Sequence, residues 1–170
     1  GSVLGHPVRI FRRPQPKARD HRSFLIIRPG GIGDAVLLVP MLAELKHVFP
    51  HATIDVLAEK RNGAVFELSR DIRYLYRYDV LREFLAVLRT GYDVVIDTEQ
   101  WHRLSAVTAR WTRAPVQIGY ATNERGRLFT HSVDYSHDDY EVNSFLHLLK
   151  PIAGDVNCPL GAPFLTIPPE

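Results

Sequence analysis

Three glycines and an aspartate separate two apolar runs in the stretch FLIIRPGGIGDAVLLVP, residues 24–40. Gly30, Gly31 and Gly33 let the backbone turn with positive φ and come close to a ligand. The free amides that open the following helix would form a site that favours an anion. Asp34 stands at the mouth of this site, where a carboxylate could take a proton from a substrate hydroxyl. The spacing therefore predicts an anion-binding turn with a general base beside it.

Asp34 also suits a structural duty, because an aspartate at a helix N-cap accepts hydrogen bonds from the first free amides. The positive end of the helix would favour the ionised carboxylate at neutral pH. One side chain can combine both duties, so the capping and the catalytic interpretation stay open together.

Two common nucleotide-binding motifs do not fit the turn. A dinucleotide fingerprint anchored on Gly31 and Gly33 needs a small residue at position 36, where Val36 stands. The acidic residue expected after the second strand is also badly placed, because Glu59 is followed at once by two basic residues. A Walker loop is excluded because no Gly-Lys-Ser/Thr follows. These features argue against an NAD site and a P-loop.

Short apolar runs alternate with helical periods along the chain from residue 24. This alternation predicts right-handed crossovers and an α/β fold: a Rossmann-like, doubly wound, mostly parallel sheet with helices on both faces. In such a sheet the ligand crevice lies at the carboxyl ends of the strands, where the glycine turn belongs. The expected strands are 24–28, 52–58, 73–79, 92–99, 116–121 and 127–135, and the expected helices are 34–49, 62–69, 80–89, 103–111 and 140–150.

The composition is that of an ordinary globular domain. The 170 residues are 45% hydrophobic and 24% charged, which is enough for a core. The formal net charge of +2 is too small to indicate nucleic-acid binding. A single cysteine, Cys158, excludes an internal disulfide framework and a cysteine-based zinc site. No apolar run approaches the roughly 18 residues of a transmembrane helix.

Both ends of the chain differ from its middle. Residues 1–22 include a basic run interrupted by prolines, which predicts a flexible leader. This leader is either simply solvated or attracted to an anionic membrane or to phosphates. Residues 23–154 are expected to form the Rossmann-like lobe, and the proline-rich residues 155–170 are typical of a linker toward a further domain.

Several segments resemble glycosyltransferase family 9, the heptosyltransferases of lipopolysaccharide core assembly. The segment IIRPGGIGDAVLLVPMLAELKHVFPHATIDVL is similar to the start of that family's N-terminal lobe. The likeness continues in YDVVIDTE and RLSAVTARWTRAPVQIGY, where the family has a strand ending in Asp, a helix and an Ile-Gly-aromatic strand. It extends loosely to VNSFLHLLKPIAG, so it covers about residues 24–154.

This resemblance implies a GT-B enzyme, in which two Rossmann-like lobes face each other across a cleft. The N-terminal lobe holds the acceptor, and a C-terminal lobe that is missing here holds the nucleotide-sugar donor, commonly ADP-heptose. Transfer inverts the anomeric centre without a bound metal or other cofactor. The aspartate of the family's Gly-Asp pair is the expected base and falls on Asp34.

The residues agree with metal independence. Metal-dependent sugar transferases usually present an Asp-x-Asp pair, and none occurs in this sequence. Asp138 and Asp139 are adjacent, so on a strand they would face opposite sides. The stretch HSVDYSHDDYE could attract an ion adventitiously, but its spacing does not predict a built metal site.

The resemblance also implies an anionic glycan or glycolipid acceptor, because lipopolysaccharide core sugars carry carboxylates and phosphates. Lys60 and Arg103 are the favoured basic residues, since both follow strands that should end at the crevice. Just past the fourth strand, Trp101 could stack on a sugar, while Glu99 and His102 could bond its hydroxyls. Each basic residue could instead be a solvated surface charge, and Trp101 could pack under its loop. The further candidates are Arg28, Arg61, Arg125, Arg127 and, as a weaker stacking residue, Tyr120.

The leading hypothesis is the acceptor lobe of an inverting, metal-independent glycosyltransferase that transfers heptose to a bacterial cell-envelope glycan. It places the protein in the cytoplasm, with room for peripheral contact at the inner face of the cytoplasmic membrane. The alternatives are a non-catalytic glycan- or partner-binding module and a nucleotide-binding Rossmann domain. Two departures from the family's pattern, TEQWHRLSA after the fourth strand and Tyr140 near the last helix, leave open a different acceptor or sugar.

Overall fold

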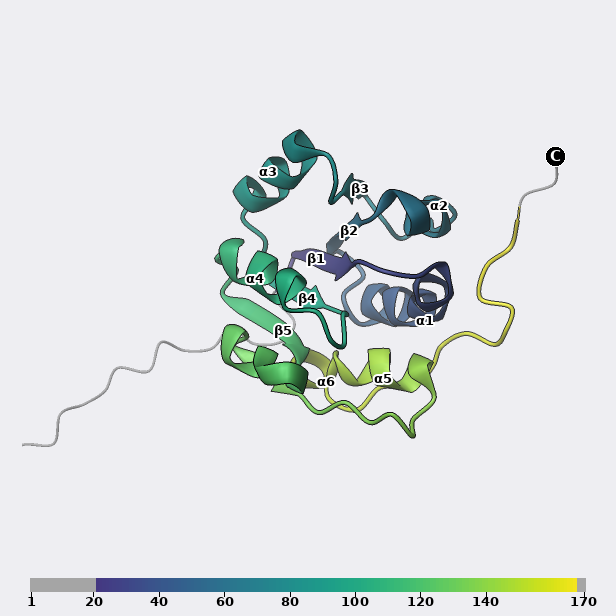
Figure 1. Ribbon diagram of the computed structural model, residues 1–170. Helices are drawn as coiled ribbons and strands as arrows, with labels where there is room; N and C mark the ends of the chain where they lie inside the picture. The colour runs from purple at the N-terminus through teal and green to yellow at the C-terminus, as the bar shows by residue number, and fades with distance from the viewer. Residues whose placement is uncertain (1–20, 168–170) are drawn as a thin grey trace, which may run out of the picture.

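The computed structural model describes residues 21–167, which form a six-stranded, fully parallel sheet with helices on both faces (Figure 1). The strand order is β3-β2-β1-β4-β5-β6, so the direction of winding reverses between β1 and β4. This order confirms the predicted α/β, doubly wound, Rossmann-like architecture. The strands are β1 (Ser23–Arg28), β2 (Thr53–Ala58), β3 (Tyr74–Arg77), β4 (Val94–Asp97), β5 (Val116–Tyr120) and β6 (His131–Val133).

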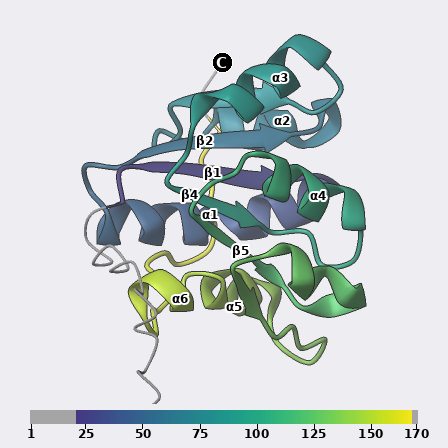
Figure 2. The same cartoon turned by 90° about the vertical axis from the view of Figure 1, so that its left-hand side faces the viewer.

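The helices form two layers, one on each face of the sheet (Figure 2). One core cluster lies under α1, α2, α5 and α6, and the other lies under α3 and α4. In β1, Phe24 and Ile26 enter the first cluster while Leu25 and Ile27 enter the second, because successive side chains point to opposite faces. The helices are α1 (Ile32–Val48), α2 (Lys60–Glu67), α3 (Leu81–Thr90), α4 (Arg103–Trp111), the 3₁₀ segment η2 (Thr122–Leu128), α5 (Glu141–His147) and α6 (Lys150–Ala153).

Two predicted elements are wrong in extent. The expected strand 127–135 is reduced to β6, because η2 continues through Leu128 before the chain rejoins the sheet. The expected helix 140–150 is split into α5 and α6. Pro151 has no amide hydrogen with which to extend the hydrogen bonds of α5, and it suits the first turn of a new helix.

The ends of the chain are described only in part. The predicted leader, residues 1–22, lies outside the described residues except for its last two positions. Residues 155–167 of the predicted linker contain no helix or strand, yet Phe164 and Leu165 pack against the core beneath α1. The domain boundaries therefore stay predictions. No helix within residues 21–167 is long and apolar enough to cross a membrane.

Candidate functional site

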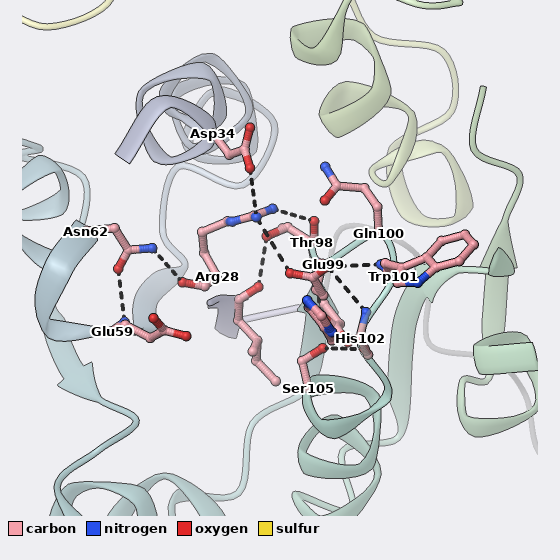
Figure 3. A network of polar contacts seen from close by, with 12 residues as sticks. Arg28, Asp34, Glu59, Asn62, Thr98, Glu99, Gln100, Trp101, His102 and Ser105 are labelled. Carbon is pink, nitrogen blue, oxygen red and sulfur yellow. Dashed lines mark hydrogen bonds and ion pairs between the residues drawn. The ribbon is translucent and has the colours of Figure 1, made fainter. Parts of the chain in front are cut away.

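The predicted site residues gather where the carboxyl ends of β1, β2 and β4 meet (Figure 3). Arg28 ends β1, Glu59 follows β2, and the loop 98–102 follows β4. All strands point the same way, so residues far apart in the sequence converge at one edge of the sheet. This edge also carries the reversal of strand order, which is the usual position of a ligand crevice in such sheets.

The turn between β1 and α1 requires glycine at one position above all. Gly30 has φ +106°, a conformation that residues with a side chain rarely adopt. A β-carbon there would lie 3.0 Å from Arg28 Nη2. At Gly31 and Gly33 an added β-carbon would meet no described atom within 4 Å, and both residues are exposed. The backbone therefore requires glycine at position 30, whereas Gly31 and Gly33 leave open space at the start of α1.

Asp34 is not the N-cap of α1, so the capping prediction is wrong. The helix begins at Ile32, two residues earlier than expected, and its N-cap is Gly31, which makes no side-chain capping bond. Asp34 lies inside the first turn, where its Oδ2 accepts a hydrogen bond from Arg28 Nη2 at 3.1 Å. Its side chain is 43% exposed, and no described residue donates to Oδ1. One carboxylate oxygen is held, and the other can meet a ligand.

Arg28 is a buried cation and not the open anion-binding residue expected from the sequence. Its side chain is 2% exposed, and its Nη1 donates to the carbonyl of Thr98 at 2.8 Å. Its Nη2 lies 3.1 Å from Asp34 Oδ2 and 3.7 Å from Glu99 Oε2. The guanidinium also lies 5.7 Å from the ring centroid of Phe145. Arg28 therefore orients two carboxylates and ties β1 to the loop after β4.

The carboxylate of Glu99 was expected to bind sugar hydroxyls. In the structure it holds the loop after β4 in place. The side chain is buried, and its Oε1 accepts hydrogen bonds from the amides of Trp101 at 2.9 Å and His102 at 3.3 Å. Its Oε2 faces Arg28. Trp101 is 57% exposed and His102 is exposed too, so Trp101 does not pack under its loop. The loop presents an indole and an imidazole at the carboxyl edge.

The predicted basic residues on the surface differ in how far they are already paired. Lys60 is exposed in the first turn of α2. Arg61 lies 2.6 Å from Glu59 in an exposed ion pair. Arg103 lies 2.9 Å from Glu124, and both side chains are exposed. A ligand could compete for Arg61 and Arg103, because surface ion pairs of this kind are weak.

The side chain of Arg125 points into the protein interior. The sequence did not predict its direction. Its Nη2 lies 2.5 Å from Asp97 Oδ2 with both side chains fully buried, and its Nη1 donates to the carbonyl of Glu99. Burial raises the pKa of Asp97 to about 6, and Arg125 and the amide of Glu99 oppose that shift. Arg127 in the same segment is exposed. The buried pair fixes the base of the loop after β4, so Arg125 is not available to an acceptor.

Asn62, which is not among the predicted site residues, completes the site. Its Nδ2 donates to the carbonyl of Arg28 at 3.0 Å, and its Oδ1 accepts from the amide of Glu59 at 2.9 Å. Glu59 and Asn62 form a reciprocal capping box at the start of α2. The spacing Glu-x-x-Asn before a helical run was the signal for it. This side chain fixes the start of α2 against the end of β1.

A second group of polar contacts links the loop after β4 to α5. Gln100 Nε2 donates to Glu141 Oε1, and the hydroxyl of Tyr135 donates to Oε2 of the same carboxylate at 2.9 Å. Tyr120, predicted as a stacking residue, is fully buried with its ring centroid 5.1 Å from that of Tyr135. That prediction is wrong, because β5 ends within the core and leaves no ring face for a sugar.

The charges of the site fall into two groups. Arg28 balances Asp34 and Glu99, while Arg125 balances Asp97. Within residues 21–167 no group of three or more His, Cys, Asp or Glu side chains could hold a metal ion. The arrangement offers a half-exposed carboxylate beside an accessible helix start, which suits proton transfer from a ligand with anionic groups nearby.

Comparison with known proteins gives one curated relative of interest. No protein-family model matches the chain. The chain is 26% identical over 136 residues to lipopolysaccharide heptosyltransferase 3 of Escherichia coli (strain K12), an alignment that covers 71% of this chain and 39% of that protein. The expected resemblance to the heptosyltransferases of glycosyltransferase family 9 is confirmed. The chain spans well under two thirds of the length of this relative.

Several solved glycosyltransferase structures share the fold. E. coli heptosyltransferase WaaC with ADP has a TM-score of 0.72 at 16% identity, over 84% of this chain and 50% of that chain. E. coli ADP-heptose lipopolysaccharide heptosyltransferase II has a TM-score of 0.69 at 18% identity, over 86% and 47%. A family 9 glycosyltransferase from Veillonella parvula has a TM-score of 0.67 at 16% identity, over 81% and 43%. The chain thus has the fold of about half of each of these proteins.

Proposed function

We propose that this chain is the acceptor-binding lobe of an inverting, metal-independent glycosyltransferase. The enzyme transfers a sugar, heptose in the first instance, from a nucleotide-sugar to a bacterial lipopolysaccharide or other cell-envelope glycan. The observation that carries the proposal is the half-exposed carboxylate of Asp34, held by Arg28 beside an open helix start. The similarity to lipopolysaccharide heptosyltransferase 3 supports the choice of substrate class.

Asp34 is the general base of the proposed reaction. Its Oδ1 takes the proton from the acceptor hydroxyl while the hydroxyl oxygen forms a bond to the anomeric carbon. The bond from that carbon to the nucleoside diphosphate breaks, and the diphosphate leaves with the electron pair. A single displacement of this kind inverts the anomeric centre. Arg28 orients the carboxylate of Asp34 because it donates to the opposite oxygen, Oδ2.

The acceptor lies along the carboxyl edge in this proposal. Lys60 and Arg103 attract its anionic groups, and the exposed indole of Trp101 covers a sugar face. His102 bonds a hydroxyl from the same loop. The space before Gly31 and Gly33 admits a ligand to the amides that open α1.

The donor binds outside this lobe in the proposal. E. coli heptosyltransferase WaaC, which has this fold, has been solved with ADP and with ADP-2-deoxy-2-fluoro heptose, and this chain corresponds to about half of that protein. A second lobe of the full-length protein therefore holds the nucleotide-sugar across the cleft. A lipid-linked acceptor would locate the reaction at the inner face of the cytoplasmic membrane.

Replacing Asp34 by Asn in the full-length protein tests the base assignment. Loss of a general base lowers turnover by roughly 10²–10⁴-fold. We expect a fall in kcat of at least about 10²-fold for Asp34→Asn, with the Kd for the nucleotide-sugar unchanged within about twofold. Asp71→Asn, at the opposite edge of the sheet, is the matched control and should keep full turnover.

The same experiment separates the proposal from the non-catalytic alternative. Unchanged turnover in Asp34→Asn would remove Asp34 from the mechanism. A wild-type full-length protein that binds the glycan but transfers no sugar from any nucleotide-sugar would favour a binding module.

A further inference from the structure

The helices α3 and α4 expose apolar side chains on their outer faces. Leu81 is 71% exposed on α3 and Leu85, one turn later, is 36% exposed. On α4, Leu104 is 64% exposed and Trp111, seven residues on, is 56% exposed. Residues four or seven apart lie on the same face of a helix. Each helix therefore presents an apolar stripe that no described residue covers.

Arginines accompany both stripes. Arg82 and Arg89 lie beside the stripe of α3, and Arg110 and Arg113 lie at the end of α4. These four side chains are exposed, and within residues 21–167 none of them has an ion-pair partner. The sequence of α4 contains no acidic residue. On α3 the only acid is Glu83, whose Oε2 accepts a hydrogen bond from the backbone amide of residue 77 at 2.6 Å.

The two helices come together at their carboxyl ends around one hollow, and we call their outer faces together the α3–α4 surface. Both lie on the same face of the sheet, opposite α1 and α2 (Figure 1, Figure 2). A hollow of about 640 Å³ between their carboxyl ends is lined by Leu88, Trp111, Gln117 and two arginines. Gln117 is 2% exposed, and its Oε1 has no hydrogen-bond partner among the described residues. Because this oxygen is itself shielded, the hollow offers a docking partner Trp111 and the arginines.

We propose that the α3–α4 surface docks on a membrane that contains anionic phospholipid. Basic surfaces with exposed leucine and tryptophan bind the boundary between headgroups and acyl chains, because apolar side chains enter it and arginines pair with phosphates. A second copy of the chain would place arginine against arginine, and such like-charge contact opposes self-association.

The orientation of the helices connects this surface to the candidate site. Both α3 and α4 begin at the carboxyl edge of the sheet, so Leu81 and Leu104 lie toward the edge that carries the candidate site. Docking would hold the open edge beside the membrane. The inference goes beyond the proposed function and does not depend on it, because vesicle binding requires no sugar transfer.

Co-sedimentation with vesicles tests the α3–α4 surface. Wild-type chain should sediment with phosphatidylglycerol–phosphatidylcholine vesicles, much less with phosphatidylcholine alone, and less as salt is added. The double variant Arg110→Ala/Trp111→Ser should lower the partition coefficient on phosphatidylglycerol by about tenfold or more. The matched control, Leu68→Ser/Arg70→Ala, changes the same kinds of exposed residue on the opposite face and should bind like wild type.

Three results would overturn the proposal. Equal binding of the test and control variants would assign any membrane contact to the basic leader. Wild-type chain that ignores phosphatidylglycerol vesicles would exclude the docking. Concentration-dependent dimerisation that is lost in the test variant, without vesicle binding, would make the surface a contact between copies. If the test variant has an altered circular dichroism spectrum, Leu81→Ser/Arg82→Ala on α3 replaces it, with the same tenfold loss expected.

Discussion

Arg28 is the residue on which the candidate base depends. Its guanidinium lies between the carboxylates of Asp34 and Glu99 and is removed from water. A buried cation requires such partners, because loss of hydration strongly disfavours an unpaired charge. By holding Asp34 Oδ2 it leaves Oδ1 in a fixed direction, which a general base needs in order to meet a hydroxyl. Arg28 is a positioning residue in the proposed mechanism.

Replacing Gly30 or Gly33 by alanine should change the stability of the protein in opposite directions. Gly30→Ala forces a β-carbon into positive φ and against Arg28, so we expect the free energy of unfolding to fall by about 1–3 kcal/mol. Gly33→Ala adds a β-carbon in open space within α1 and should raise it by roughly 0.4–1 kcal/mol. Urea denaturation measures both. If Gly33 also serves ligand approach, Gly33→Ala in the full-length protein will be more stable yet slower in transfer.

Asp97 should titrate far above the usual range of an aspartate. Burial raises its pKa to about 6 from the ordinary 3.8. Because the folded-state pKa is the higher one, the stability this group contributes is fully present below about pH 3.8 and is lost as the pH rises through about 6. Carbon-13 NMR of the Asp97 carboxyl group measures the midpoint. A midpoint near 3.8 would show that Arg125 and the other hydrogen-bonding partners fully offset the effect of burial.

At the scale of elements, the contact between β5 and the end of η2 depends on Gly119 of β5. A β-carbon on Gly119 would lie 2.7 Å or less from three ring atoms of Phe129, which packs on that position. η2 carries Arg125 into its pair with Asp97, so this contact also supports the loop after β4. The Ile-Gly-Tyr sequence therefore has a packing reason, since any side chain at Gly119 would displace the ring.

Gly119→Ala should destabilise the protein because the added methyl overpacks the contact between β5 and η2. We expect a loss of about 1–3 kcal/mol in the free energy of unfolding. Gly63→Ala is the matched control, since its β-carbon would make an ordinary 3.5 Å contact with Leu75 and lie within α2. It should stabilise by roughly 0.5–1 kcal/mol. Equal effects in thermal or urea denaturation would contradict the role given to Phe129.

At the scale of the whole molecule, the sheet supports two different surfaces, the carboxyl edge and the α3–α4 surface. Its carboxyl edge carries the candidate base and the exposed residues of two loops, whereas one helical face carries the α3–α4 surface. The solved relatives are about twice as long as the aligned part of this chain. In the proposed function the edge becomes a cleft only when a second lobe faces it.

Donor binding should therefore require the full-length protein. We expect calorimetric titration of ADP-heptose to show saturable binding to the full-length protein and none to the 170-residue chain at the same concentrations. The reason is that the edge described here has no dinucleotide fingerprint, with Val36 at the position that must be small. Binding to the chain alone would contradict the division between lobes and favour a nucleotide-binding Rossmann domain.

Most elements were predictable because their signals are local. The buried strand 24–28 and helix 103–111 follow from runs and periods of apolar residues and agree with β1 and α4. The extent of β6 was not predicted, since η2 is fixed by contacts with distant loops. The break between α5 and α6 was also missed, although Pro151 was a local signal for it. The gathering of Arg28, Asp34, Glu99 and Trp101 at one edge was expected because parallel strands end at the same edge of the sheet.

The sequence by itself determined the sheet, the place of the glycine turn and the likeness to family 9. Only the tertiary structure decided what each charged side chain does. It turned Arg28 and Arg125 inward, moved Asp34 from the N-cap into the first turn of α1, and exposed Trp101. The reason is physical. Apolar patterns report burial of the backbone segment, whereas the direction of a long polar side chain depends on partners that lie far away in the sequence.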